Sequence, residues 1–167
     1  MINVQHFRQT DSSRCGPAVV KMLLNYYGIE ATEDELCKRC DHSYELGCED
    51  VGMIKAFQSY DLAVKVYNNC TLEDLEYWIQ HHIPVIVDWF ASGATIEDCA
   101  NGHSSIVVDI DREYVYLLDP TDPKIYSIKR DDFLRVWFDW RRSPFITKWE
   151  EMILRQIIVP FPKRLAI

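Results

Sequence analysis

The sequence is poor in several features that define whole classes of protein. Its 167 residues include six glycines and seven prolines, too few for a collagen-like, linker-dominated or low-complexity chain. Basic residues are also few, since 18 lysines and arginines against 26 aspartates and glutamates give a formal net charge of −8. Nucleic acids and anionic membrane surfaces attract concentrated positive charge, so neither is an expected partner. With 48% hydrophobic and 26% charged residues, the composition predicts one ordinary globular domain.

Long apolar runs are missing as well. Asp88 interrupts the run PVIVDWFA and Lys21 interrupts AVVKMLL, so no stretch of the sequence is long enough to span a membrane. The N-terminal segment MINVQHFRQTDSSRC contains no apolar core of the kind found in signal peptides. We therefore expect a cytoplasmic protein whose six cysteines are thiols rather than a disulfide framework. No glycine-rich phosphate loop occurs, and no cofactor is predicted.

Helical periodicity dominates the first half of the chain, and strand patterns follow it. Gly16-Pro17 opens an apolar-periodic helix that Gly28 closes, and Thr32 and Thr71 are capping residues for two more helices. The predicted elements are helices over 16–28, 33–38, 50–60, 71–81 and 131–138, and strands over 85–90, 103–110, 114–119 and 124–129. Helices first and strands later predict an α+β fold, with an N-terminal helical half packed on a C-terminal antiparallel sheet.

A candidate nucleophile stands at the start of the first helix. Cys15 directly precedes Gly16-Pro17, so its thiol lies at a helix N-terminus, where unpaired N–H groups and the helix dipole favour a thiolate. Its own backbone N–H can donate to an oxyanion on the carbon that the sulfur attacks. Gln9, six residues earlier, carries an amide N–H suited to the second donor role. Cysteine is also among the most buried residue types, so a packed structural thiol is the alternative.

Two residues at predicted strand ends could supply the base and the group that orients it. His103 opens one strand and Asp119 closes the next, so a hairpin brings both to the same end. An odd-length loop such as 111–113 pairs Asp119 with Ser105, whose side chain shares the face of His103. A two-residue turn pairs it with Ser104 on the opposite face. Catalysis therefore predicts the odd loop, and purely structural roles for both residues are the alternative.

A second cluster contains residue types that suit zinc. Cys37 and Cys40 have the CxxC spacing, and His42 and Cys48 follow shortly after them. Thiols packed around the second and third predicted helices are the simpler interpretation, so no metal is assigned. Zinc held by these four residues is the alternative.

Three segments in order, RQTDSSRCGPAVVKMLLNYYG, GHSSIVV and YVYLLDP, resemble the papain-like cysteine peptidases that process bacteriocin leader peptides. That family is best known as the N-terminal domain of peptide-exporting ABC transporters. The resemblance covers residues 5–140 and implies a papain-like fold. It implies these roles: Cys15 as nucleophile, His103 as general base and then acid, Asp119 as orienting carboxylate and Gln9 as oxyanion donor. It also implies that a peptide or protein substrate is hydrolysed, often after a Gly-Gly pair.

The chain departs from this family in three respects. No transmembrane or ATPase segment follows the matched region, which predicts a stand-alone enzyme. The insert 91–102 ahead of His103 is longer than usual and could cover the cleft. The apolar and aromatic tail 143–167 lies outside the resemblance. We therefore expect a peptidase domain over 1–142 and an extension, helix or strand, that packs on the core or on a partner.

Two other functions fit the same residues. Papain-like sites also perform amide deamidation and acyl transfer, because the thioester accepts whichever nucleophile reaches it. A non-catalytic interaction module with a relict site is the second alternative, since the chain is acidic and contains five tryptophans, nine tyrosines and seven phenylalanines.

Overall fold

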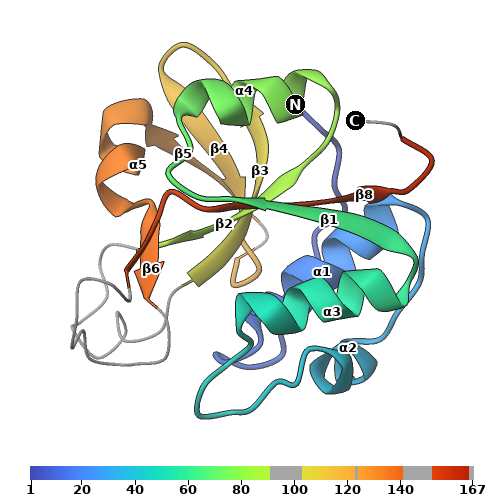
Figure 1. Cartoon of the computed structure of the whole chain (residues 1–167). Helices are drawn as coiled ribbons and strands as arrows, with labels where there is room; N and C mark the ends of the chain where they lie inside the picture. Colours follow the sequence, from blue (N-terminus) through green and yellow to red (C-terminus); the bar gives the residue numbers. More distant parts are fainter. Residues whose placement is uncertain (91–102, 123, 141–151, 166–167) are drawn as a thin grey trace.

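The computed structural model describes residues 1–90, 103–122, 124–140 and 152–165 (Figure 1). The described helices are α1 (Cys15–Tyr26), α2 (Glu33–Arg39), α3 (Asp50–Ser59), α4 (Leu72–Gln80) and α5 (Arg130–Val136). The described strands are β1 (Leu62–Tyr67), β2 (Val85–Trp89), β3 (His103–Ile110), β4 (Tyr114–Leu118), β5 (Ile125–Lys129), β6 (Phe138–Trp140), β7 (Met152–Leu154) and β8 (Ile157–Pro162). The insert 91–102 lies outside the described residues.

The main sheet has six described strands in the order β1-β8-β2-β3-β4-β5, and each neighbouring pair is antiparallel. β8 comes from the C-terminal tail but lies between β1 and β2, where Ile158 pairs with Ile86. β6 and β7 form a separate two-stranded sheet. The described part of the tail beyond residue 142 therefore supplies an inner strand of the main sheet as well as β7.

The helices form two groups around this sheet. α1, α2 and α3 pack on one another and gather below the sheet in Figure 1, whereas α4 lies above it and contacts β2 and β3. α5 packs on β4 and β5. The helical group begins with Cys15, and the sheet contains His103. The expected α+β fold, with a helical half against an antiparallel sheet, is confirmed.

Local sequence explains where several of these helices begin and end. The Thr71 side chain accepts a hydrogen bond from the Asp74 N–H, while the Asp74 carboxylate accepts one from Thr71, which is a complete capping box for α4. Thr32 caps α2 by accepting from Glu35 N. After α1, Gly28 has φ +77°, the left-handed conformation that glycine adopts without steric cost.

Two strands, β1 and β6, were not predicted from the sequence, and β7 lies in the tail for which either a helix or a strand was expected. β1 (LAVKVY) is short and lies between two strongly periodic helices, and its edge position leaves Val66 and Tyr67 exposed. β6 and β7 have only three residues each and pair with one another at long range. Short segments of this kind depend on their partner strands, which local propensity does not reveal.

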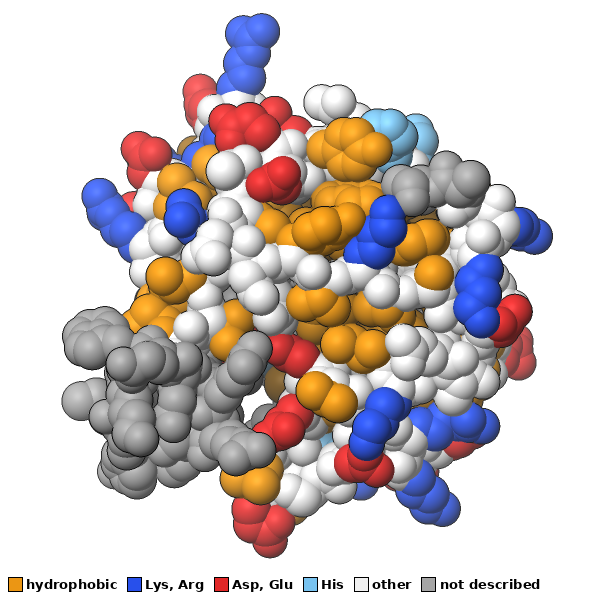
Figure 2. Space-filling model, viewed as in Figure 1, with side chains coloured by type: hydrophobic (Ala, Val, Ile, Leu, Met, Phe, Trp, Pro, Cys, Tyr) orange, Lys and Arg blue, Asp and Glu red, His pale blue; other side chains and the backbone are white. Residues whose placement is uncertain are grey.

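The core continues from the sheet into the helical group. Its fully buried residues include Val19 and Leu23 on α1, Phe57 on α3, and Val159 on β8. Figure 2 shows hydrophobic side chains gathered across the middle of one face, around β1 and β8, with charged groups mainly at its margin. Within the described ranges, no helix has the length and apolarity needed to cross a membrane.

Candidate active site

The segment before Cys15 is fixed by polar contacts on both sides. Asp11 accepts from Ser13 N at 2.9 Å and from the Ser13 hydroxyl at 2.6 Å. His42 Nε2 lies 2.9 Å from that hydroxyl, and Arg14 binds Asp11 at 2.8 Å. These contacts anchor the turn that leads into α1, and they place the Cys15 thiol at the N-terminus of that helix.

The structure brings the predicted base and its orienting carboxylate together. His103 Nε2 lies 2.6 Å from Asp119 Oδ2, and the Asp119 side chain is almost fully buried. Cys15 also lies close enough to the imidazole to raise the pKa of His103. Residues from α1, from the start of β3 and from the end of β4 therefore meet at one place.

The predicted partner of Asp119 is correct and residues 111–113 connect the two strands as expected, but the pairing beside this connection differs from the prediction. At the hairpin end Ile110 pairs with Val115, so four residues connect them, an even number. A β-bulge between Val107 and Asp109 then shifts the register by one residue, after which Ile106 pairs with Leu118. A bulge adds a residue to one strand only, which has the same effect on side-chain parity as an odd loop.

This register places Ser105 opposite Asp119, as catalysis required. The Ser105 hydroxyl donates to Asp119 Oδ2 at 2.9 Å. The other oxygen, Oδ1, accepts from Thr121 N at 2.8 Å and from the Thr121 hydroxyl. Both carboxylate oxygens thus accept hydrogen bonds, which holds the plane of the carboxylate and satisfies its charge.

These contacts shift the pKa values of the pair in opposite directions. Burial disfavours the imidazolium, but the hydrogen bonds and charges of Asp119 and Cys15 outweigh burial and raise the pKa of His103 to about 10. Burial also opposes the charge of Asp119, yet His103 and Thr121 lower the pKa of Asp119 to about 2. At neutral pH Asp119 is therefore an anion that accepts the Nε2 proton, which leaves Nδ1 as the nitrogen available to Cys15.

The N-terminal segment carries Gln9 across the end of β4. Gln9 N donates to the Pro120 carbonyl at 2.9 Å, and His6 Nε2 donates to the Asp119 carbonyl at 2.7 Å. The Gln9 side chain donates from Nε2 to the Asp11 carbonyl at 2.6 Å. Its Oε1 is buried and has no hydrogen-bond partner within the described ranges. Gln9 is thus tied both to the Asp119 turn and to the segment before Cys15.

A profile of the Peptidase C39 family matches residues 3–140. The chain belongs to the peptidase C39 family. The match spans most of the chain, so the resemblance inferred from the three sequence segments is confirmed, and the chain is a peptidase of the cysteine class. No sequence among the curated proteins matches it significantly.

Solved structures share the C39 fold at low sequence identity. The peptidase domain of Streptococcus ComA, an ABC transporter of a quorum-sensing pathway, has a TM-score of 0.72 at 16% identity, covering 96% of this chain and 100% of that domain. A Bacillus anthracis protein described as a C39-like peptidase has a TM-score of 0.70 at 14% identity, covering 98% and 96%. A double-glycine-motif protease from an AMS/PCAT transporter, solved with its leader peptide, has a TM-score of 0.63 at 19% identity, covering 96% and 94%.

Four polar neighbours of the C39 site were not recognised as such from sequence. The sequence indicates Ser105 only through its register, and it assigns no role to Trp89, His6 or Thr121. The Asp-Pro-Thr sequence gives a usable signal for Thr121, because an aspartate side chain commonly accepts from the backbone two residues later. His6 and Trp89 reach the site through tertiary packing alone, and no local pattern indicates them.

The zinc candidates are dispersed around α2. His42 directs Nε2 to Ser13, and the Cys48 thiol lies 3.7 Å from the Cys40 carbonyl. Hydrogen bonding to Cys40 and burial raise the pKa of Cys48, and burial raises that of Cys37. In the part of the chain that the structure describes, no three His, Cys, Asp or Glu side chains are placed to hold a metal ion, and the described cysteines are free thiols.

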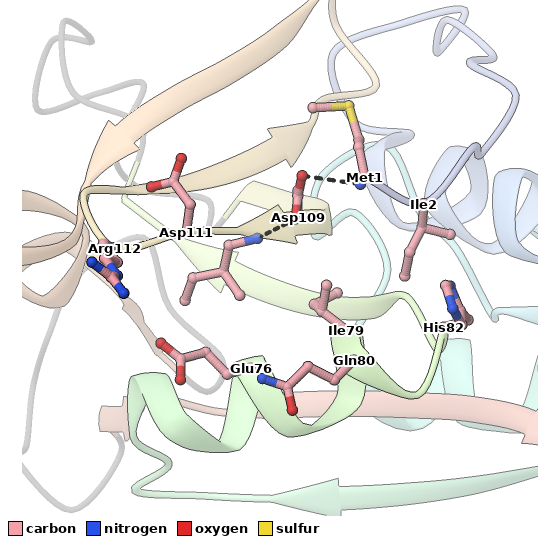
Figure 3. Close-up of a pocket in the computed structure, with 10 residues that line it drawn as sticks. Met1, Ile2, Glu76, Ile79, Gln80, His82, Asp109, Asp111 and Arg112 are labelled. Carbon is pink, nitrogen blue, oxygen red and sulfur yellow. Dashed lines mark hydrogen bonds and ion pairs between the residues drawn. The ribbon is translucent and has the colours of Figure 1, made fainter.

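A pocket of about 400 Å³ lies beside α4, and none of the candidate catalytic residues lines it (Figure 3). It is lined by residues of α4, the N-terminus and the β3–β4 turn, including Glu76, Ile79 and Arg112. The Met1 amine pairs with Asp109 at 3.1 Å on its wall. The pocket shares no lining residue with the Cys15, His103 and Asp119 group, so pocket size does not locate this candidate site.

Proposed function

We propose that this C39 peptidase hydrolyses a peptide bond through a Cys15-His103-Asp119 triad, with Gln9 as an oxyanion donor. The observation that carries the proposal is the His103–Asp119 hydrogen bond of 2.6 Å beside the α1 N-terminus, where Cys15 interacts with the same imidazole. Nucleophile, base and orienting carboxylate at one place are the arrangement shared by unrelated thiol and serine hydrolases.

The first half of the reaction forms a thioester. The Cys15 thiolate attacks the carbonyl carbon of the scissile bond, and the carbonyl oxygen becomes an oxyanion. The Cys15 N–H and the Gln9 proton not bound to Asp11 donate to this oxyanion, each stabilising it by on the order of 3 kcal/mol. His103, protonated at Nδ1, gives that proton to the leaving amine, and the C–N bond breaks.

The second half hydrolyses the thioester. Neutral His103 accepts a proton from water at Nδ1, and the resulting hydroxide attacks the thioester carbon. The acid product leaves, and the sulfur returns as a thiolate paired with the imidazolium. Throughout, Asp119 accepts the Nε2 proton and keeps Nδ1 directed toward the reacting atoms.

Peptide substrates are proposed on the basis of the family and its structural neighbours. One neighbour is a double-glycine-motif protease in complex with a leader peptide. We propose a peptide or protein substrate for this chain too, with cleavage after a Gly-Gly pair as the first sequence to test. The net charge of −8 favours substrates that carry basic residues.

Mass spectrometry of peptide products tests this function. A peptide library that includes Gly-Gly sequences is incubated with the wild type and with Cys15→Ala. We expect two fragments per cleaved peptide with the wild type and none with the variant. Equal cleavage by Cys15→Ala would exclude Cys15 as the nucleophile. A gain of about one dalton without fragmentation would instead identify a deamidase that uses the same thioester chemistry.

A further inference from the structure

Two consecutive serines of β3 face opposite sides of the sheet and serve different carboxylates. The Ser105 hydroxyl, which is fully buried, donates to Asp119 Oδ2 at 2.9 Å. The Ser104 hydroxyl, also buried, donates to Asp88 Oδ1 at 2.5 Å. The neighbouring side chains are chemically the same, yet only Ser105 contacts the carboxylate that binds His103.

The direction of the Ser105 hydroxyl is fixed by a buried indole. Trp89 Nε1 donates to Ser105 Oγ at 2.9 Å, and an indole N–H can only donate. The serine has one proton, and with its oxygen accepting from Trp89, that proton points to Asp119. Trp89 is also the register partner of His103, and their rings meet edge to face with centroids 6.2 Å apart. One tryptophan therefore borders the imidazole and orients the hydroxyl that holds its carboxylate.

We infer that Ser105 is a positioning residue for the Asp119 carboxylate and that Trp89 acts through Ser105. This inference rests on the proposed function, because it needs His103 to be the catalytic base. Ser105 anchors Oδ2 and Thr121 anchors Oδ1, so the carboxylate cannot rotate when His103 changes between imidazole and imidazolium. Loss of the Oδ2 anchor leaves the Nε2 hydrogen bond in place but lets its direction vary.

Turnover of p-nitrophenyl acetate tests this inference without a known peptide. The Cys15 sulfur attacks the acetyl carbon, p-nitrophenolate leaves, and water activated by His103 releases acetate from the thioester. Nitrophenolate leaves without protonation, so only the second step depends on an oriented base. We expect Ser105→Ala to slow deacylation by about tenfold or more, the effect of a lost hydrogen bond to a charged group, and to change acylation much less.

Ser104→Ala is the matched control, because it removes the adjacent buried hydroxyl that serves Asp88. It should deacylate within about twofold of the wild type, even where its thermal stability falls as much as that of Ser105→Ala. Equal deacylation rates for the two variants would show that Ser105 only stabilises the fold. That result would overturn the inference.

Trp89→Phe keeps an aromatic ring beside His103 and removes the indole N–H together with the five-membered ring that carries it. We expect slower deacylation, and no further loss when it is combined with Ser105→Ala, because both changes act on the same carboxylate. If the rate losses of the two single variants multiply in the double variant, Trp89 does not act through Ser105, and that result would overturn the inference. If Ser105→Ala does not fold, a Trp89→Phe variant with wild-type deacylation would overturn it instead.

Failure of the proposed function gives a different result. In that case the wild type and Cys15→Ala react with the ester equally, and no acetyl group is found on Cys15 by mass spectrometry. If the wild type is acetylated at Cys15 but all serine variants deacylate alike, the triad stands and only the role of Ser105 is lost.

Discussion

At the residue scale, the site depends on one carboxylate whose neighbours all donate to it. His103 and Ser105 donate to Oδ2 of Asp119, and Thr121 donates to Oδ1 from both its backbone and its hydroxyl. None of these groups presents an acceptor to the carboxylate oxygens. Position 119 therefore suits an ionised acid and not a neutral side chain that must itself donate.

Asp119→Asn is the substitution that tests this requirement. Either orientation of the amide directs its NH₂ group at donors, Ser105 and His103 on one side or Thr121 on the other. We expect the hydrolysis rate to fall by on the order of 10³-fold or more, because the imidazole loses its orientation and tautomer. Steady-state kinetics on a peptide that the wild type cleaves measures the loss. Asp122→Asn, which removes a nearby partner of Lys124, should retain the wild-type rate; an equal loss would make the effect one of folding.

At the element scale, the start of α1 packs tightly against the segment that follows α2. A Cβ atom built on Gly16 would lie 2.7 Å from Cys48 Cβ and 3.2 Å from its sulfur. The proposed nucleophile, Cys15, is the neighbouring residue, so the position of its thiol depends on this close approach. Helix propensity alone favours alanine at position 16, and the packing reverses that preference.

Gly16→Ala is therefore expected to destabilise the protein and displace Cys15. Overpacking of this kind costs about 1–3 kcal/mol in unfolding free energy, which urea denaturation measures. Iodoacetamide labelling of Cys15 at neutral pH should slow in parallel. Cys48→Gly removes the opposing Cβ, so the double variant should recover labelling, whereas Cys48→Ala retains that Cβ and should not. Recovery in both backgrounds would exclude the Cβ contact as the cause.

The elements also show which parts of the site sequence could predict. Cys15, His103 and Asp119 stand at element ends marked by a Gly-Pro helix start, a strand pattern and an Asp-Pro turn, so their meeting was predictable. The bulge between Val107 and Asp109 was not predictable, because an extra residue in one strand does not change the apolar pattern of that strand. Asp119 reaches the expected face only because the bulge offsets the even number of residues between Ile110 and Val115.

At the scale of the whole molecule, the C-terminal tail completes the main sheet, and the N-terminal segment binds to that sheet before it enters the helical half. β8 lies between β1 and β2 in the sheet, although at least 67 residues of the chain separate it from each of them. Strand propensity does not reveal that position. Ile2 N donates to the Val108 carbonyl at 2.8 Å, which ties the N-terminal segment to the bulge. Gln9 N then binds the Pro120 carbonyl. Contacts between segments that are far apart in the sequence therefore position the groups that local sequence patterns only suggested.

The ion pair between His103 and Asp119 should make stability depend on pH. The pKa of His103 rises from its ordinary 6.5 to about 10 in the folded protein, so folding favours the imidazolium. That stabilisation is fully present below pH 6.5 and is lost as the pH rises through about 10. The lowered pKa of Asp119 affects stability in acid. Its contribution to stability is present above pH 3.8 and is lost as the pH falls through about 2.

His103→Gln isolates the alkaline part of this dependence. The glutamine cannot titrate, so the wild type should exceed the variant in melting temperature by more at about pH 6 than at about pH 10. Other groups, including the tyrosines, titrate in both proteins and cancel in the difference. Differential scanning calorimetry at matched ionic strength measures it. A difference that stays constant across this range would mean that His103 takes up no extra proton on folding, and the charged pair with Asp119 would then be absent at rest.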